Sequence, residues 1–418
     1  MKQQNQFAWR GYFVQVVFGV CALLLFVRAL DLQVLDDGFL ANQGEARFLR
    51  TADIPAHRGK ITDRFGRPLA VSTPVDTIAA NPKELAEISD LDFDGLAKVL
   101  GKGVEQLRRE IDRAGDKEFM YLRRHLRPSQ AAAVLNLELP SVRRIREYRR
   151  YYPAGEVSAH ILGFTNIDDI GQEGLELAFD QWLSGTQGQK RVLKDRLGRT
   201  VKDVESIKPP HAGKDLEVSI DMRIQYLAYR ELKSAVARLQ ARSGSVVVLD
   251  VNTNEVLAMV NRPSYNPNNR GDSPVAYFRN RAVTDIFEPG SSFKPLIIAA
   301  ALESGIYLPK TKVDTSPGFL QVGLKTIPDT KDFGLIDVTG VLTNSSNVGA
   351  AKIALSLEPE YLWSTLARFG VGRLTDSGFP GESAGLLNHF DHWREINHAT
   401  IAYGYGLTVS PMQLAQAY

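Results

Sequence analysis

Residues 288–295 read Glu-Pro-Gly-Ser-Ser-Phe-Lys-Pro, and the apolar run LIIAAALESG follows them directly. The Pro289-Gly290 pair ends the preceding segment, and a proline is tolerated in an α-helix only within the first turn. Pro295 therefore predicts a helix that begins near Ser291. Residues three apart lie on one face of a helix, so Ser291 and Lys294 are expected to project side by side.

This spacing suits nucleophilic catalysis. A serine hydroxyl is a poor nucleophile until a base removes its proton. Lysine can be that base only when its amine is neutral, and both burial and the positive end of a helix dipole lower the pKa of a lysine. Lys294 would experience both influences in the first turn of a buried helix. By itself, however, Ser-x-x-Lys fits an N-cap serine followed by a surface lysine better than it fits an active site.

A second polar motif lies downstream, where residues 343–349 read Thr-Asn-Ser-Ser-Asn-Val-Gly. In its triplet Ser345-Ser346-Asn347, one residue separates the Ser345 hydroxyl from the Asn347 amide. These groups could relay a proton from Lys294 and hold a substrate amide. A loop or helix cap rich in serine and asparagine would give the same pattern, so the triplet alone decides nothing.

The N-terminal region is strongly apolar. Residues 11–27 read GYFVQVVFGVCALLLFV, and with Leu30 the run approaches the ~20 residues needed to cross a bilayer. No small-residue cleavage site for a secretory signal follows this run. Positive charges precede the run and acidic residues follow it, which favours a cytoplasmic N-terminus. We expect a cytoplasmic tail (1–10), a transmembrane anchor (11–30) and an amphipathic juxtamembrane linker (31–54), with a buried core helix as the alternative to an anchor.

Composition limits the remaining possibilities. The chain has 418 residues, enough for two or three domains, and 44% hydrophobic with 23% charged residues is typical of a folded protein. The formal net charge of +2 provides no argument for nucleic-acid binding. Cys21 is the single cysteine, which excludes an internal disulfide and a cysteine-based zinc site.

Hydrophobic periodicity predicts a mixed α+β protein. Apolar residues recur at helical spacing in 84–114. A strand is expected at Leu216–Ile220, followed by a helix that Asp221 caps and that continues to about Ala241. The apolar runs 245–251 and 255–260 flank Asn252-Thr-Asn254 and predict a hairpin.

Two clusters of polar residues have both a structural and a functional interpretation. An arginine-rich segment is interpreted as a solvated helix face and strand edge rather than a contact to an anionic polymer or membrane. It comprises Arg123, Arg124, Arg127, Arg143, Arg144, Arg146, Arg149 and Arg150. Three histidines, His389, His392 and His398, could suggest a metal site, but a loop and helix surface is the favoured interpretation. No metal or organic cofactor is expected.

Together, the Ser291/Lys294 and Ser345/Asn347 motifs resemble those of serine penicillin-recognising enzymes, which carry Ser-x-x-Lys, Ser-x-Asn and Lys-Thr-Gly. Longer strings narrow the resemblance to class B penicillin-binding proteins, and in overall pattern to the septal transpeptidase of Gram-negative bacteria. These strings are Arg58–Ala70 (RGKITDRFGRPLA), Gly174–Glu176 with Phe179-Asp180 and Leu183–Gly185, Asn261–Asn268 (NRPSYNPN) and Tyr403–Ala415 (YGYGLTVSPMQLA).

The resemblance implies a fold and a set of roles. It implies a pedestal domain (55–212) and a transpeptidase domain (213–418) that consists of an antiparallel sheet with helices on both sides. Ser291 would be the acylated nucleophile and Lys294 the general base. Ser345 would relay the proton, and the Asn347 amide would orient the substrate. The oxyanion would be held by the backbone N–H of the nucleophile and by one from the Lys-Thr-Gly strand.

One motif departs from the family pattern. The sequence contains no Lys-Thr-Gly, since Lys325-Thr326 is followed by Ile327, and the chain reaches Tyr418 inside an apolar helix. We expect the third motif to lie beyond Tyr418, so the 418-residue polypeptide itself should acylate poorly. Robust labelling of that polypeptide by fluorescent penicillin would contradict this expectation.

The resemblance implies a peptidoglycan D,D-transpeptidase of septal wall synthesis, held in the inner membrane with a periplasmic catalytic domain. It also implies stem peptides and β-lactams as ligands, and division proteins, including a glycan polymerase, as partners. Two alternatives stay open at this point. A D,D-carboxypeptidase or β-lactamase would transfer the acyl group to water, although no deacylating glutamate can be identified. An inactive anchored scaffold or β-lactam sensor would fit the missing third motif.

Overall fold

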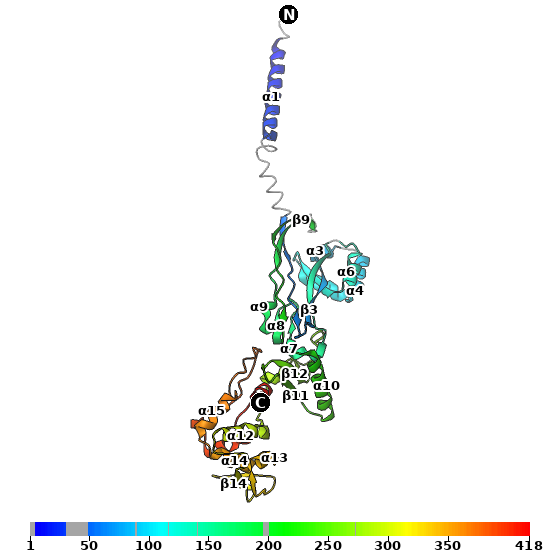
Figure 1. Cartoon of the computed structure of the whole chain (residues 1–418). Helices are drawn as coiled ribbons and strands as arrows, with labels where there is room; N and C mark the ends of the chain where they lie inside the picture. Colours follow the sequence, from blue (N-terminus) through cyan, green and yellow to red (C-terminus); the bar gives the residue numbers. More distant parts are fainter. Residues whose placement is uncertain are drawn as a thin grey trace. The chain divides into compact units, whose positions relative to one another are not determined.

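The computed structural model describes residues 5–30, 49–87, 90–115, 117–139, 141–194, 200–271 and 273–418. These residues form a mixed α+β structure, as predicted (Figure 1). By internal packing the chain divides into two compact units. Unit 1 comprises Met1–Ala56, Val75–Glu147 and Thr186–His211, and unit 2 comprises His57–Pro74, Tyr148–Gly185 and Ala212–Tyr418.

The chain begins with one long apolar helix, α1 (Asn5–Leu30), drawn in blue in Figure 1. Its segment Trp9–Leu30 has a mean hydropathy of 2.3 and is exposed along its whole length. A contiguous apolar surface of this kind is unfavourable in water, and its 22 residues are enough to span a bilayer. The predicted anchor, 11–30, lies within this helix. Of the predicted linker, residues 31–48 lie outside the described residues, and 49–54 form a strand.

Unit 1 contains a three-stranded sheet, a separate strand pairing and a small helical layer. A three-stranded antiparallel sheet has the order β1 (Leu49–Ile54), β8 (Gly188–Lys194) and β9 (Thr200–Lys208). The second half of β3 (Pro68–Ala80) pairs with β4 (Met120–Leu126). Helices cover this pairing, and three of them confirm the helical pattern predicted across 84–114. The helices are α3 (Pro82–Leu85), α4 (Asp90–Leu100), α5 (Val104–Ala114) and α6 (Pro128–Leu135).

The apolar side chains of these helices and strands form one buried cluster in unit 1. Leu96 and Leu107, from α4 and α5, pack with Leu122 of β4, and all three are fully or nearly fully buried. Ile78 of β3 belongs to the same buried cluster. The 3.6-residue period of the sequence thus corresponds to a helix face that contacts a sheet.

In unit 2, short elements surround a buried charge network. The elements are β2 (Ile61–Thr62), η2 (Gly155–Val157), α7 (Ala159–Leu162), β6 (Phe164–Thr165), β7 (Gly171–Glu173), α8 (Gly174–Ala178), α9 (Asp180–Leu183) and β10 (Leu216–Glu217). Arg58 Nε donates to Glu176 at 2.8 Å, and Arg150 Nε donates to the other oxygen of the same carboxylate at 2.6 Å. Arg58 also donates to Asp180 at 2.7 Å. The two pedestal signatures of the sequence are therefore neighbours in space.

The arginine-rich segment corresponds only in part to its predicted solvated surface. β5 (Arg143–Tyr151) contains most of the segment. Arg146 is half-exposed and pairs with Asp76, as expected of a strand edge. Arg150, however, is 4% exposed, so its assignment to a solvated face is wrong. Periodicity could not identify it, because the carboxylate that compensates its burial, Glu176, comes from another part of the chain.

The remaining part of unit 2 begins with a helix and a hairpin that the sequence predicts. Asp221 caps α10 (Met222–Arg238) by accepting a hydrogen bond from the backbone N–H of Arg223. β11 (Gly244–Leu249) and β12 (Val256–Arg262) form the predicted antiparallel hairpin, and α10 packs on β12. The strand expected at Leu216–Ile220 is shorter, since only Leu216–Glu217 pairs.

A cluster of helices follows the hairpin. Its central helix, α12 (Lys294–Glu303), buries apolar side chains around most of its circumference, which explains the absence of a polar face in its sequence. The surrounding elements are η3 (Val275–Tyr277), α11 (Arg281–Thr284), η4 (Gly290–Phe293), β13 (Lys312–Asp314), β14 (Phe319–Val322), β15 (Lys325–Pro328), β16 (Leu335–Asp337), α13 (Val338–Thr343), α14 (Asn347–Leu355), α15 (Pro359–Arg368), η5 (Phe390–His392), α16 (Glu395–Ile401) and α17 (Pro411–Ala417).

Candidate active site

Ser291 lies in a tight turn that leads into α12. Gly290 has a φ of +61°, a conformation that glycine adopts without steric cost, and the turn η4 follows. Ser291 is exposed, whereas Lys294, at the first position of α12, is 1% exposed. Pro295 occupies the first helical turn, as predicted. The turn therefore presents the serine hydroxyl outward and places the lysine amine beneath it.

Lys294 is surrounded by hydrogen-bond acceptors without a net charge. Its Nζ lies 3.2 Å from Ser291 Oγ, 3.0 Å from Ser345 Oγ and 2.8 Å from Asn347 Oδ1. Its fourth contact is the backbone carbonyl of Ser345. The structure therefore brings all four predicted site residues together, although the two motifs lie far apart in the sequence.

The backbone between α13 and α14 presents the second motif. Ser345 has a φ of +55°, which turns the chain and directs both its carbonyl and its hydroxyl toward Lys294. Ser346 then caps α14, because its Oγ accepts from the backbone N–H of Gly349 at 2.8 Å. Asn347 is the first residue of α14. The middle residue of the triplet is therefore structural, and the outer two face the lysine.

Asp329 is a member of this site that the sequence reasoning missed. Its carboxylate accepts hydrogen bonds from Ser346 Oγ and from the backbone N–H groups of Asn347 and Val348. It thereby holds the turn that carries the second motif. Asp329 follows the last residue of β15, in a stretch with no recognisable motif, so no local sequence signal could have identified it.

The electrostatics of the site favour a lysine that can lose its proton. Burial lowers the pKa of Lys294 to about 8, and the charge of Asp329 opposes this shift without cancelling it. An amine with this pKa is neutral in an appreciable fraction of molecules near neutral pH and can accept the proton of Ser291.

The glycine-rich string 403–406 supports the segment that precedes the nucleophile. Gly404 O accepts a hydrogen bond from Gly290 N at 3.2 Å, and Gly406 N donates to Glu288 Oε1 at 2.9 Å. A Cβ on Gly404 would lie 2.2 Å from Gly290 O, so only glycine permits this approach. The string therefore helps to position the turn that presents Ser291.

The three histidines of the C-terminal region do not converge. His398 is buried in α16, and burial lowers its pKa, whereas His389 pairs with Asp391 at 3.0 Å near the surface. Across the described ranges, no group of three or more His, Cys, Asp and Glu side chains could hold a metal ion.

Comparisons with known proteins agree with this geometry. A family model described as the penicillin binding protein transpeptidase domain matches residues 244–418, and one described as the penicillin-binding protein dimerisation domain matches residues 53–218.

Two relatives and one solved structure illustrate the similarity. The peptidoglycan D,D-transpeptidase FtsI of Escherichia coli is 42% identical, over 99% of this chain and 71% of its own length. The probable peptidoglycan D,D-transpeptidase PbpC of Pseudomonas aeruginosa is also 42% identical, over 98% of this chain and 72% of its own. A complex of penicillin-binding protein PBP2 with MreC from Helicobacter pylori has a TM-score of 0.69 at 21% identity, over 88% of this chain and 76% of that chain, and so shares the fold.

The fold and the serine–lysine pair are those expected of an acyl-transfer enzyme with a serine nucleophile and a lysine base. With the matches above, the chain belongs to the penicillin-binding protein family. The catalytic roles of Ser291, Lys294, Ser345 and Asn347 remain predictions that the geometry supports.

Proposed function

We propose that the chain is a membrane-anchored peptidoglycan D,D-transpeptidase that cross-links stem peptides through an acyl-Ser291 intermediate during septal wall synthesis. One observation carries this proposal. The buried Lys294 amine forms hydrogen bonds with Ser291 Oγ and with the two outer residues of the second motif, Ser345 and Asn347. The names of the relatives, which are peptidoglycan D,D-transpeptidases including the cell-division protein FtsI, supply the substrate.

Acylation follows from these contacts. Neutral Lys294 Nζ accepts the proton of Ser291 Oγ, which attacks the carbonyl carbon of the penultimate D-Ala. The resulting tetrahedral oxyanion is stabilised by the backbone N–H of Ser291. As the bond to the terminal D-Ala breaks, the proton on Lys294 passes to the leaving nitrogen through Ser345 Oγ, which lies 3.0 Å from Nζ. Free D-Ala departs, and the acyl group stays on Ser291.

The second half-reaction reverses the proton path. The amine of a neighbouring stem peptide attacks the acyl carbon and transfers a proton to Lys294 by the same relay. The new amide bond is the cross-link, and Ser291 Oγ recovers its proton. A β-lactam enters the first step in the same way, because attack on its strained amide opens the ring and leaves an acyl-serine.

Asn347 has a double role in this proposal. Its Oδ1 holds Lys294 at 2.8 Å, and one N–H of its Nδ2 donates to Pro328 O at 3.2 Å. A side-chain amide has two N–H donors. The second donor is directed to the substrate, where it would bind a stem-peptide carbonyl.

The membrane context supports the same function. Helix α1 fits a single-pass anchor, with Arg10 near the start of its apolar segment and the acidic Asp31, Asp36 and Asp37 following the helix in the sequence. By the positive-inside rule, we propose a cytoplasmic N-terminus and a periplasmic catalytic domain at the inner membrane. Division-complex proteins, including a glycan polymerase, are the proposed partners. That PBP2 forms a complex with MreC supports protein partners in general.

A direct test uses Ser291→Ala in the full-length gene. We expect the variant to form no covalent penicillin adduct and to abolish septation, with protein level and localisation unchanged. Normal septation by this variant would favour the scaffold alternative.

A second test incubates the parent enzyme with stem peptide and an acceptor amine. Cross-linked product is the expected result. D-Ala release without cross-linked product would favour the carboxypeptidase alternative.

A further inference from the structure

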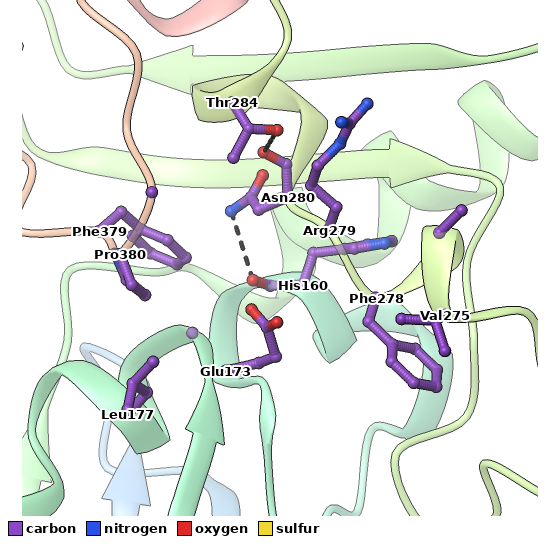
Figure 2. A pocket seen from close by; sticks show the side chains of 13 residues that line it. His160, Glu173, Leu177, Val275, Phe278, Arg279, Asn280, Thr284, Phe379 and Pro380 are labelled. Atoms are coloured by element: carbon purple, nitrogen blue, oxygen red, sulfur yellow. Dashed lines mark hydrogen bonds between the residues drawn. The ribbon is translucent and has the colours of Figure 1, made fainter.

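A pocket of about 640 Å³ lies in unit 2, built from residues that do not include the serine–lysine site (Figure 2). Its wall combines α7 and β7–α8 with the segment 275–284 and with the loop 379–381. A volume of this size accepts a small ligand or a long side chain of another protein. The acylation chemistry described above does not use the pocket.

The carboxylate of Glu173 is the charged group that faces the pocket. In Figure 2 it points into the space enclosed by the labelled side chains. Throughout the part of the chain that the structure describes, this carboxylate has no hydrogen-bond or ion-pair partner, and burial raises its pKa. A part-buried carboxylate without a cation is unfavourable, and a bound cation would stabilise it.

The other polar groups of the wall are already occupied. The guanidinium of Arg279 pairs with Asp285 at 2.7 Å and points away from Glu173 in Figure 2. His160 Nε2 donates to Tyr277 O at 2.9 Å, and burial lowers the His160 pKa to about 4, so the ring is neutral at physiological pH. Neither residue supplies the missing positive charge.

Hydrogen bonds hold the wall in place. Asn280 Nδ2 donates to the carbonyl of His160, and Thr284 Oγ1 donates to the carbonyl of Asn280 at 3.0 Å; Figure 2 shows both contacts. Asn280 Oδ1 in turn accepts from Asn261 at 2.7 Å. A wall fixed in this way needs little rearrangement on binding.

The apolar part of the pocket suits an aliphatic chain. Phe278, Phe379 and Pro380 line it, beside the Glu173 carboxylate. The apolar surface continues at the rim, where Val275 is 79% exposed and Leu177 is 42% exposed. Exposed apolar residues around a charged pocket are typical of a protein contact rather than of a site for a free small cation.

We propose that this pocket binds a lysine or arginine side chain of a partner polypeptide. The cationic head pairs with Glu173, and the aliphatic stem lies against Phe278, Phe379 and Pro380. Apolar residues that flank the basic residue in the partner cover Val275 and Leu177. The pocket is thus an interaction site separate from the Ser291 centre.

Methyl NMR of the full chain in detergent micelles, with ¹³C-labelled Leu and Val methyl groups, tests the proposal. The probe is the capped peptide acetyl-Leu-Arg-Leu-amide, and its matched control replaces arginine by the neutral isostere citrulline. Leu177 and Val275 report on the pocket, and Leu324, 99% exposed in the β14–β15 turn, reports on non-specific binding. We expect saturable shifts at Leu177 and Val275 only, with the citrulline peptide binding at least about tenfold more weakly.

Variants of the protein test whether the Glu173 carboxylate is the charge that binds the arginine peptide. Glu173→Gln should reduce binding of the arginine peptide to the level of the citrulline peptide, whereas Glu217→Gln, at an exposed carboxylate outside the pocket, should leave it unchanged. Val275→Lys changes an exposed position where folding is not at risk. It should lower the affinity for the arginine peptide several-fold and change the affinity for the citrulline peptide little.

Two results would overturn the proposal. The first is equal affinity of the arginine and citrulline peptides, or an unchanged affinity of the Glu173→Gln protein for the arginine peptide. Either observation would show that charge does not contribute to binding. If n-butylguanidinium binds as tightly as the arginine peptide, the flanking apolar contacts contribute nothing, and the occupant is a free small cation rather than a partner polypeptide.

Discussion

Lys294 and Arg58 are both buried cations of unit 2, but the groups around them are opposite in kind. Arg58 lies among carboxylates: burial alone would lower its pKa, but Glu176 and Asp180 outweigh burial and raise it. Lys294 lies among neutral oxygens, and burial lowers its pKa to about 8. Arg58 is therefore permanently charged and structural, whereas Lys294 can give up its proton. Whether a buried cation has a structural or a catalytic role is therefore determined by the groups around it rather than by its burial.

The strongest test of this contrast removes the lysine. In the product of the full-length gene, Lys294→Met keeps the length of the side chain but removes the base, and we expect the rate constant for acylation by penicillin to fall about a thousandfold. Stopped-flow or gel-based labelling would measure it. The control is Lys352→Met in α14, whose amine binds the carbonyl of Asp314 away from the site, and which should acylate at the parent rate. A loss of less than tenfold for Lys294→Met would contradict its role as base.

The converse experiment removes a carboxylate from the structural network. Glu176→Gln leaves Arg58 and Arg150 buried with too little negative charge, and we expect a loss of about 3–5 kcal/mol in the free energy of unfolding. Urea denaturation followed by circular dichroism would measure this loss. Glu205→Gln breaks an exposed ion pair with Arg191 and should change little. Equal stability of the two variants would show that the buried network is not structural.

A smaller effect is expected from a change at Asp329, the carboxylate that holds the second motif beside Lys294. Asp329→Asn keeps the shape of the side chain that holds the second motif but loses its charge-assisted hydrogen bonds. We expect a loss of about 1–3 kcal/mol in stability and a fall of about tenfold in acylation rate. Asp332→Asn, in the same loop but exposed, is the matched control. Unchanged acylation by Asp329→Asn would show that the motif is held by other contacts.

The mildest perturbation is a change of pH. Because neutral Lys294 is the reactive form and its pKa is lowered to about 8, the acylation rate should rise about tenfold per pH unit below 8 and level off above it. An ordinary lysine would continue to gain reactivity above pH 10. Asp329→Asn should move the midpoint downward, because the Asp329 charge raises the Lys294 pKa. A profile that is flat between pH 6 and 9 would exclude Lys294 as the titrating base.

The sequence alone determined the local features of this protein. The apolar run of α1, the hairpin β11–β12, the cap at Asp221 and the helical turn at Ser291 that leads into α12 follow from periodicity, turn residues and proline, which act within a few residues. The pairing of Ser291 with Lys294 belongs to this class, because one helical turn links them.

Only the tertiary structure decided which groups surround each charge. Asp329 reaches the second motif from the end of a separate hairpin, and Glu176 meets Arg58 and Arg150 from distant segments of the chain. The arginine-rich segment shows the consequence: Arg146 and Arg150 lie on one strand, yet one is half-exposed and the other is buried. A pKa and a desolvation cost depend on every group within a few ångströms, and folding, not sequence proximity, selects those groups.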